Sequence, residues 1–294
     1  MKWSFAVVLI SGLILGLAAH CQTVANLPIE RDIVYGKGAD VDLKLNLARP
    51  PAANGPVPAV VCVHGGGWQS GSKDAYDAAI RMLAASGYVA VAIEYRFAPK
   101  YPWPAQIEDA KCAVRYLRAH AKELSVNPDK IGAMGDSAGG HLSLLLGLMD
   151  PKDGLEGTGG NAEQSSKVQA VVNLYGPTDM RLWRALPEAE AAAQQSMGKG
   201  FDDMLKDLVG TTDRTAPVVA QASPVTYIDK GDPSILTFHG TKDPVVPFPQ
   251  AEILQKALEA GSVVHKFVPL EGAGHGLDPI LLAAVTQQTL AFFN

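Results

Sequence analysis

A serine stands between glycines near the middle of the chain, in the segment GDSAGG at residues 135–140. This segment matches the pattern G-x-S-x-G, in which glycines permit a turn so tight that the serine takes strained backbone angles and its hydroxyl stands clear of a sheet. The apolar segments 130–134 and 142–146 fit the strand that enters such a turn and the helix that leaves it. The pattern predicts that Ser137 is a nucleophile. Because glycine and serine are common in ordinary turns, a base, an acid and oxyanion donors must also be found.

His275 has the position that a general base for Ser137 would need. It lies in the loop EGAGHG at residues 271–276, between the last expected strand and the last expected helix. Loops that follow parallel strands meet at the carboxyl edge of the sheet, where the sites of open α/β folds form. The remaining histidines fall in the N-terminal leader, a glycine loop, helices or strands. His275 is therefore the predicted base.

Asp243 is the predicted acid that orients this base. It follows the apolar segment 234–238, so it should also lie on a loop at the carboxyl edge of the sheet. Asp179, after the preceding strand, is the alternative, although its carboxylate could instead bond the backbone of its own turn. The chain order serine, aspartate, histidine favours Asp243.

A glycine loop, HGGGW at residues 64–68, follows an unbroken apolar segment. Glycines have no Cβ, so their N–H groups can closely approach a developing negative charge. We expect the N–H groups of Gly66, Gly67 and Ala138 to form an oxyanion hole.

Composition limits the function classes that fit this chain of 294 residues. It is 47% hydrophobic and 19% charged, which suits one large globular α/β domain. The net charge of −5 is mild and the basic residues are scattered, which argues against a nucleic-acid partner. No metal-ligand spacing is present, and neither a metal nor another cofactor is expected. Cys62 and Cys112 should be buried free thiols rather than a disulfide.

The N-terminal pattern predicts a secretory signal peptide over residues 1–21. Lys2 precedes a short apolar run rich in small residues, and small residues before Gln22 suit cleavage there. The alternatives are an uncleaved anchor and a lipoprotein attached through Cys21. We expect a secreted or periplasmic protein whose mature domain covers residues 22–294.

Hydrophobic patterning predicts a doubly wound, mostly parallel sheet with helices on both faces. Glycines at 36–38 suggest the turn of an initial antiparallel hairpin. The eight expected strands cover residues 32–35, 41–47, 59–63, 88–95, 130–134, 168–174, 234–238 and 263–268. The expected helices include residues 75–86, 107–124, 250–260 and the C-terminal segment.

Residues 178–226 interrupt the alternation of strands and helices after the sixth strand and form a small helical, cap-like insertion. One apolar face in it is formed by Phe201, Met204, Leu205 and Leu208. Such a face packs onto the body of the domain or forms a lid over a substrate.

The glycine loop, the serine turn, Asp243 and His275 together resemble the α/β-hydrolase esterases of the hormone-sensitive-lipase type. These esterases usually carry an additional helical cap before the glycine loop, and here that space holds little beyond two strands. The chain is more similar to secreted bacterial acetylxylan and feruloyl esterases in three features: the short segment before the glycine loop, Trp68, and the segment EYRFAP at residues 94–99. The resemblance implies an α/β-hydrolase fold with an eight-stranded sheet.

The same resemblance implies a serine carboxylic-ester hydrolase that works through an acyl-enzyme. Short-chain or aryl esters are the expected substrates, with acetyl or feruloyl groups on plant polysaccharide as candidates. An amide hydrolase, such as an arylformamidase or a serine exopeptidase, is the main alternative; a lipase and a non-catalytic binding protein are two others. Aromatic residues on neighbouring loops could bind the substrate, namely Trp68, Tyr95, Phe97 and Trp103.

Overall fold

The structure is a computed structural model that describes residues 26–52 and 55–294. The expected signal peptide at residues 1–21 lies outside the described residues. Within the part of the chain that is described, no helix is both long enough and apolar enough to cross a membrane.

The core of the domain is one eight-stranded sheet with the strand order β1-β2-β4-β3-β5-β6-β7-β8. The first two strands pair antiparallel with each other and β2 pairs antiparallel with β4, whereas β4 through β8 are parallel. The predicted fold class, a mostly parallel sheet with an antiparallel edge hairpin, is confirmed. The strands are β1 (Glu30–Gly38), β2 (Val41–Ala48), β3 (Val57–Val63), β4 (Val89–Ile93), β5 (Val126–Asp136), β6 (Ala170–Leu174), β7 (Ser234–Gly240) and β8 (His265–Leu270).

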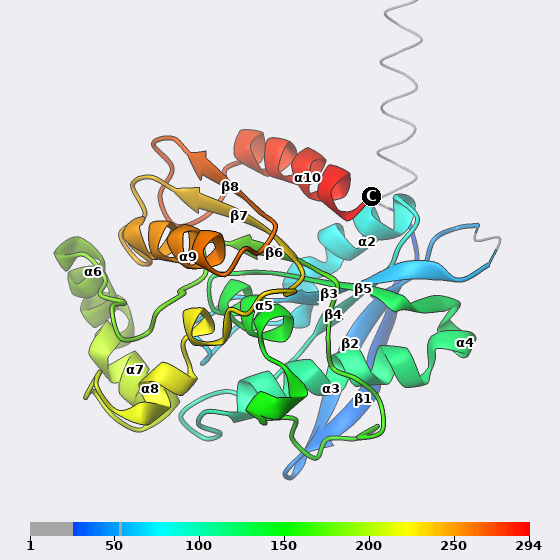
Figure 1. Ribbon diagram of the computed structural model, residues 1–294, viewed down its shortest axis with the longest axis horizontal. Coiled ribbons are helices and arrows are strands. Elements are labelled where there is room, and N and C mark those ends of the chain that lie inside the picture. The colour runs from blue at the N-terminus through cyan, green and yellow to red at the C-terminus, as the bar shows by residue number, and fades with distance from the viewer. Residues whose placement is uncertain (1–25, 53–54) are drawn as a thin grey trace, which may run out of the picture.

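Helices cover both faces of this sheet (Figure 1). Successive side chains of a strand point to opposite faces, so Val61 belongs to the core cluster that includes residues of α3, α5 and α9, while its neighbour Cys62 belongs to the cluster that includes residues of α2 and α10. Both Cys62 and Cys112 are buried and free, as predicted. The helices are α2 (Asp77–Ala85), α3 (Ala105–Ala119), α4 (Ala121–Leu124), α5 (Ala138–Leu148), α6 (Pro187–Met197), α7 (Phe201–Val209), α8 (Pro217–Gln221), α9 (Pro249–Ala260) and α10 (Pro279–Phe293), with short 3₁₀ helices η1 (Lys73–Tyr76), η2 (Pro151–Asp153) and η3 (Pro224–Tyr227).

Among the predicted boundaries that differ from the structure are the turn of the first hairpin and the end of the long helix. β1 continues through Gly38, so the glycines at 36–38 are part of the strand and the turn falls at residues 39–40. Gly36 is needed for close packing instead, because a Cβ there would press on Cys112 and on the backbone of Gly159. The long helix expected over 107–124 is two helices, which separate at His120.

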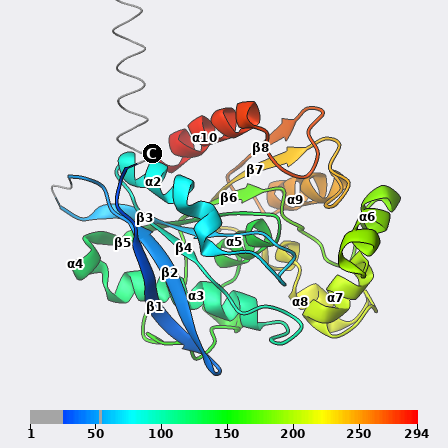
Figure 2. The same ribbon diagram turned by 180° about the vertical axis from the view of Figure 1, so that it is seen from behind.

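The insertion after β6 contains α6, α7, α8 and η3. Figure 2 shows α6 and α7 at the end of the domain opposite the β1–β2 hairpin. The predicted apolar face of α7 is buried, including Leu205 and Leu208, which are fully buried against the main core. The insertion therefore packs onto the body of the domain.

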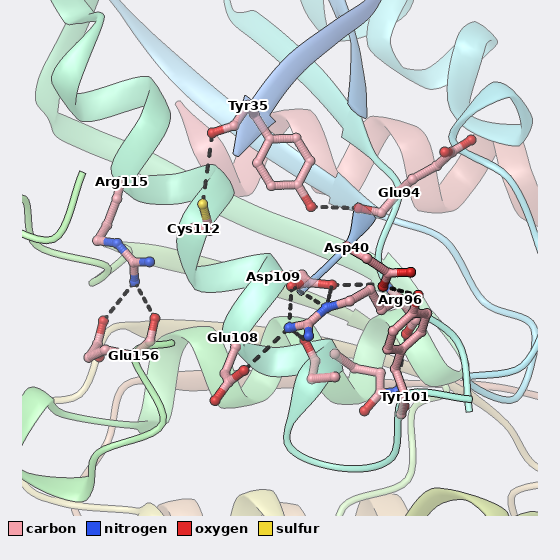
Figure 3. A network of polar contacts seen from close by, with 12 residues as sticks. Tyr35, Asp40, Glu94, Arg96, Tyr101, Glu108, Asp109, Cys112, Arg115 and Glu156 are labelled. Atoms are coloured by element: carbon pink, nitrogen blue, oxygen red, sulfur yellow. Dashed lines mark hydrogen bonds and ion pairs between the residues drawn. The ribbon is translucent and has the colours of Figure 1, made fainter. Parts of the chain in front are cut away.

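An ion pair fixes the loop after β4 to α3. Arg96 donates from its backbone N, its Nε and its Nη2 to the buried Asp109 carboxylate, with distances of 2.7–3.0 Å. Figure 3 shows Arg96 between Asp109 and the more exposed Glu108. Two residues further on, the Ala98 N–H donates to the Trp68 carbonyl oxygen at 3.0 Å. The pair therefore supports the glycine loop that ends at Trp68.

His141 connects the glycine loop, α5 and the insertion inside the core. The Trp68 Nε1 donates to His141 Nδ1 at 3.2 Å, and His141 Nε2 donates to the Ala222 carbonyl oxygen at 2.7 Å. These two bonds require the neutral Nε2–H tautomer. Burial lowers the pKa of His141 from 6.5 to about 4, because the interior disfavours its charged form.

We predict that Asp109→Ala destabilises the domain by about 3–5 kcal/mol, because it leaves a largely buried Arg96 guanidinium without its main partner. Glu108→Ala is the matched control on the same helix; it removes a partly exposed pair and should cost less than about 1 kcal/mol. Urea unfolding followed by circular dichroism measures both changes. Equal losses in the two variants would contradict the assigned role of Asp109.

The neutral His141 also predicts a pH dependence of stability. In the unfolded chain this histidine binds a proton below about pH 6.5, whereas in the folded protein it does so only near pH 4. The contribution of neutral His141 to the free energy of unfolding is therefore complete above pH 6.5. It is lost as the pH falls through about 4. The total loss is about 3 kcal/mol. His141→Gln keeps an uncharged side chain that can bond the same partners. The advantage of the wild type over this variant in unfolding free energy should therefore shrink on acidification, and an unchanged difference would rule the effect out.

Candidate active site

Ser137 lies on the sharp turn between β5 and α5. Its backbone angles, φ 51° and ψ −119°, are in a region that non-glycine residues rarely adopt. Glycine is required on both sides, because a Cβ at Gly135 would overlap the Gly139 carbonyl, and one at Gly139 would overlap the Val63 carbonyl of β3. The Ser137 N–H donates to the Leu174 carbonyl oxygen at 2.9 Å. The turn is thus held between two neighbouring strands, and the serine is at the carboxyl edge of the sheet.

The three predicted residues of the triad form one hydrogen-bond chain. His275 Nδ1 donates to Asp243 Oδ2 at 2.8 Å, and its Nε2 then accepts from the Ser137 hydroxyl at 3.0 Å. They come from three loops, after β5, β7 and β8. This is the geometry that general-base activation of a serine requires.

Asp243 is fixed by its own loop. Its Oδ1 accepts from the N–H groups of Val245 and Val246, each at 2.9 Å, which leaves Oδ2 for His275. A second histidine, His239, lies 3.6 Å from Asp243 but donates its Nε2 proton to the Val246 carbonyl. Burial lowers the pKa of His239, so a positive charge there is disfavoured.

The alternative acid, Asp179, is engaged elsewhere. Its carboxylate accepts from the backbone N–H and the guanidinium of Arg181 at 2.8–3.0 Å. The structure therefore brings Asp243, and not Asp179, to His275.

The glycine loop lies beside the serine turn. Gly66 and Gly67 have φ of +118° and +60°, and a Cβ at either would overlap Ser70 or Met204. Their N–H groups donate to no acceptor in the described part of the chain, and the Ala138 N–H is at the first turn of α5, where helix N–H groups have no partner within the helix. The three groups expected to bind an oxyanion are thus free to do so.

Asp136 connects the serine turn to the glycine loop. Its Oδ1 accepts from the Gly65 N–H at 3.0 Å and from the Tyr76 hydroxyl at 2.8 Å. Sequence analysis did not assign a role to this residue, although it directly precedes the serine.

A cavity of about 630 Å³ opens at Ser137 and is mostly apolar. Its walls come from the glycine loop, the loop after β7 and the insertion. Three aromatic rings stack edge to face along one side, with centroid distances of 5.6 Å for Trp68–Trp183 and 5.5 Å for Trp183–Phe201. The lining includes Gly66, Gly67, Trp68, Ser70, Asp136, Ser137, Tyr175, Pro177, Trp183, Glu188, Ala189, Ala193, Phe201, Met204, Pro244, Val245, Val246 and His275.

Of the four aromatic residues expected to bind substrate, only Trp68 lines this cavity. Tyr95 stacks on His64 and donates its hydroxyl to the His64 carbonyl, and Phe97 packs edge-on against both rings. Trp103 is buried and donates to Gln221. Tyr95, Phe97 and Trp103 thus support the loops around the site instead of lining it.

Two aromatic residues of the cavity were missed. Tyr175 follows β6 at the carboxyl edge, and its ring lies 4.9 Å from that of His275; its position after a strand could have identified it. Trp183 lies in the insertion, where no sequence pattern shows which side chains point inward. No group of three or more potential metal ligands occurs in residues 26–52 and 55–294.

Known proteins of similar sequence are esterases. Esterase LipC of Mycobacterium tuberculosis is 36% identical over 229 residues, which are 76% of this chain and 54% of that protein. Esterase LipQ of the same organism is 31% identical over 264 residues, 88% of this chain and 59% of that protein. The chain spans about half the length of these curated relatives.

Solved structures of similar fold match over most of both chains. A truncated form of a carbohydrate esterase from gut microbiota has a TM-score of 0.76 and 26% identity, over 90% of this chain and 95% of that one. Est2 of Thermogutta terrifontis with bound propionate has a TM-score of 0.73 and 28% identity, over 92% and 94%. The family model BD-FAE matches residues 45–258. With its eight-stranded sheet and its glycine and serine turns, the chain therefore has the α/β-hydrolase fold and belongs to the BD-FAE family.

Proposed function

We propose that this protein is a serine carboxylesterase that hydrolyses short-chain or aryl esters through an acyl-enzyme. The observation that carries the proposal is the unbroken chain of hydrogen bonds from Asp243 through His275 to Ser137, at the base of a cavity with free N–H groups. Esterases of known sequence and structure add support, since LipC is identical at 36% of the aligned positions and Est2 shares the fold.

In the proposed acylation step, His275 Nε2 takes the hydroxyl proton of Ser137 while the serine oxygen attacks the ester carbonyl. The negative charge that develops on the carbonyl oxygen is stabilised by the N–H groups of Gly66, Gly67 and Ala138. His275 then gives its proton to the leaving alcohol. Asp243 keeps the imidazole in the tautomer with its proton on Nδ1 and stabilises its cationic form.

Deacylation repeats these steps with water in place of the alcohol. His275 removes a proton from the water, whose oxygen attacks the acyl carbon, and the proton returns to Ser137 as the acid leaves.

For the substrate, we propose acetyl or feruloyl groups on plant polysaccharide. A carbohydrate esterase is among the structural neighbours, and a propionate-bound esterase is another. The cavity is open enough for a bulky alcohol and its aromatic wall suits an aryl or sugar ring. The signal peptide expected at residues 1–21 is consistent with action outside the cytoplasm, where such polymers occur.

Ser137→Ala should lower kcat on p-nitrophenyl acetate by roughly 10⁴- to 10⁶-fold, because the nucleophile is removed. Methyl ferulate, acetylated xylan and a series of longer p-nitrophenyl esters, measured on the wild type, define the acyl and alcohol preference. Equal activity in the wild type and the variant would exclude Ser137 as the nucleophile. Much higher kcat/KM on N-formyl or aminoacyl amides than on esters would instead favour the alternative amide hydrolase.

Asp243→Asn should lower kcat by on the order of 10⁴-fold, since the asparagine no longer selects the working tautomer of His275. Asp179→Asn is the matched control, because Asp179 bonds Arg181 and not the histidine; its kcat should stay within a few-fold of the wild type. Rates on p-nitrophenyl acetate test both, and the reverse order of effects would make Asp179 the acid.

A further inference from the structure

Lys199, in the short connection between α6 and α7, bonds the insertion to the glycine loop (Figure 1). Its ammonium group donates to the side-chain oxygen of Gln69 at 2.5 Å and to Asp207 Oδ2 on α7 at 2.7 Å. Among the described residues, Lys199 is the only hydrogen-bond partner of the Gln69 side chain, whose Nε2 is buried without one. The insertion is therefore attached directly to the residue that follows Trp68.

Gln69 belongs to the turn that orients one of the expected oxyanion donors. The carbonyl oxygen of Gly66 accepts from the N–H groups of Gln69 and Ser70 and from the Ser70 hydroxyl, each at 3.1 Å. This carbonyl and the Gly67 N–H belong to one trans peptide unit, so the two groups point in opposite directions. The bonds that hold the carbonyl toward residues 69–70 thus direct the Gly67 N–H away from them. Gly67 lines the catalytic cavity, and its N–H has no acceptor in the described part of the chain.

A second contact from the insertion supports the same peptide unit. The Met204 methyl group on α7 lies against Gly67, at 2.3 Å from the point where a Cβ would stand. Glycine backbones adopt many conformations, so the Gly66–Gly67 peptide unit needs neighbours that hold it in one orientation. The insertion supplies two of them, the Met204 methyl group and the bond from Lys199 to Gln69.

We propose that Lys199 is a positioning residue for the oxyanion hole. Through Gln69 it holds the Gly66–Gly67 peptide unit so that the Gly67 N–H points at the charge that develops on the substrate carbonyl oxygen. Lys199 does not itself line the catalytic cavity, so it acts on the reaction through Gln69. This inference rests on the proposed esterase function. An oxyanion donor acts mainly in the transition state, so the loss of Lys199 should slow the chemical step more than it weakens substrate binding.

Lys199→Met keeps most of the length of the side chain and removes the ammonium group. It should lower kcat/KM on p-nitrophenyl acetate by roughly tenfold, less than the ~10²- to 10³-fold loss expected when a donor itself is removed. Lys199→Arg can still donate to both partners and should restore kcat/KM to within about threefold of the wild type. Lys206→Met removes the same charge from an exposed position on α7 and is the control, with no change expected.

A transition-state analogue separates positioning from a general loss of structure. Benzyl trifluoromethyl ketone takes up the Ser137 oxygen at its carbonyl carbon, the hydroxyl proton passes to His275, and the resulting oxyanion occupies the oxyanion hole. Its inhibition constant should rise in Lys199→Met by the same factor as kcat/KM falls. A partly unfolded variant would instead have fewer active sites and an unchanged inhibition constant. That result would overturn the proposal.

A double-mutant cycle tests whether Lys199 acts through Gln69. Gln69→Met should lower kcat/KM about as much as Lys199→Met, and the double variant should be no worse than either single one. Additive losses, or equal kcat/KM in Lys199→Met and the wild type, would overturn this inference and leave the esterase function intact. A wild type that hydrolyses no ester would disprove the proposed function, and this inference with it.

Discussion

The carboxylate of Asp136 connects the two loops from which the candidate site is built. It is the last residue of β5 and directly precedes Ser137, and it accepts hydrogen bonds from Gly65 in the glycine loop and from Tyr76 in η1. The position of the nucleophile and the position of the expected oxyanion donors are therefore set by one side chain. A charged acceptor makes stronger bonds than a neutral one, which suits a group that must hold a glycine-rich backbone in strained conformations.

The sheet explains why residues more than a hundred positions apart meet at this point. Parallel strands all end at the same edge, so the loops after β3, β5, β7 and β8 bring the glycine loop, Ser137, Asp243 and His275 together. Each loop is then fixed by local bonds, such as those from Val245 and Val246 to Asp243. The strand order gives the approximate positions, and these short bonds give the final geometry.

Sequence patterns were sufficient for the fold class and for the residues that form the hydrogen-bond chain, because both depend on local rules: apolar segments, chain order and glycines at tight turns. They were insufficient for the walls of the cavity. Tyr95 and Trp103 are aromatic and lie on the loop after β4, the strand next to β3 and its glycine loop, yet they turn inward to bond His64 and Gln221. The direction of a side chain on an irregular loop depends on distant packing partners, which no local pattern contains.

The insertion has the same limitation, and it supplies part of the cavity wall beside Ser137. α7 is at once a core element and a cavity wall, since Leu205 is buried against the body while Phe201 and Met204 face the site. The Met204 methyl group also touches Gly67, one of the expected oxyanion donors. A change in the insertion that admits a larger ester would therefore also move a group that contacts the oxyanion hole. In the proposed esterase, the size of the cavity and the position of the oxyanion donors would therefore be linked through the contact between Met204 and Gly67.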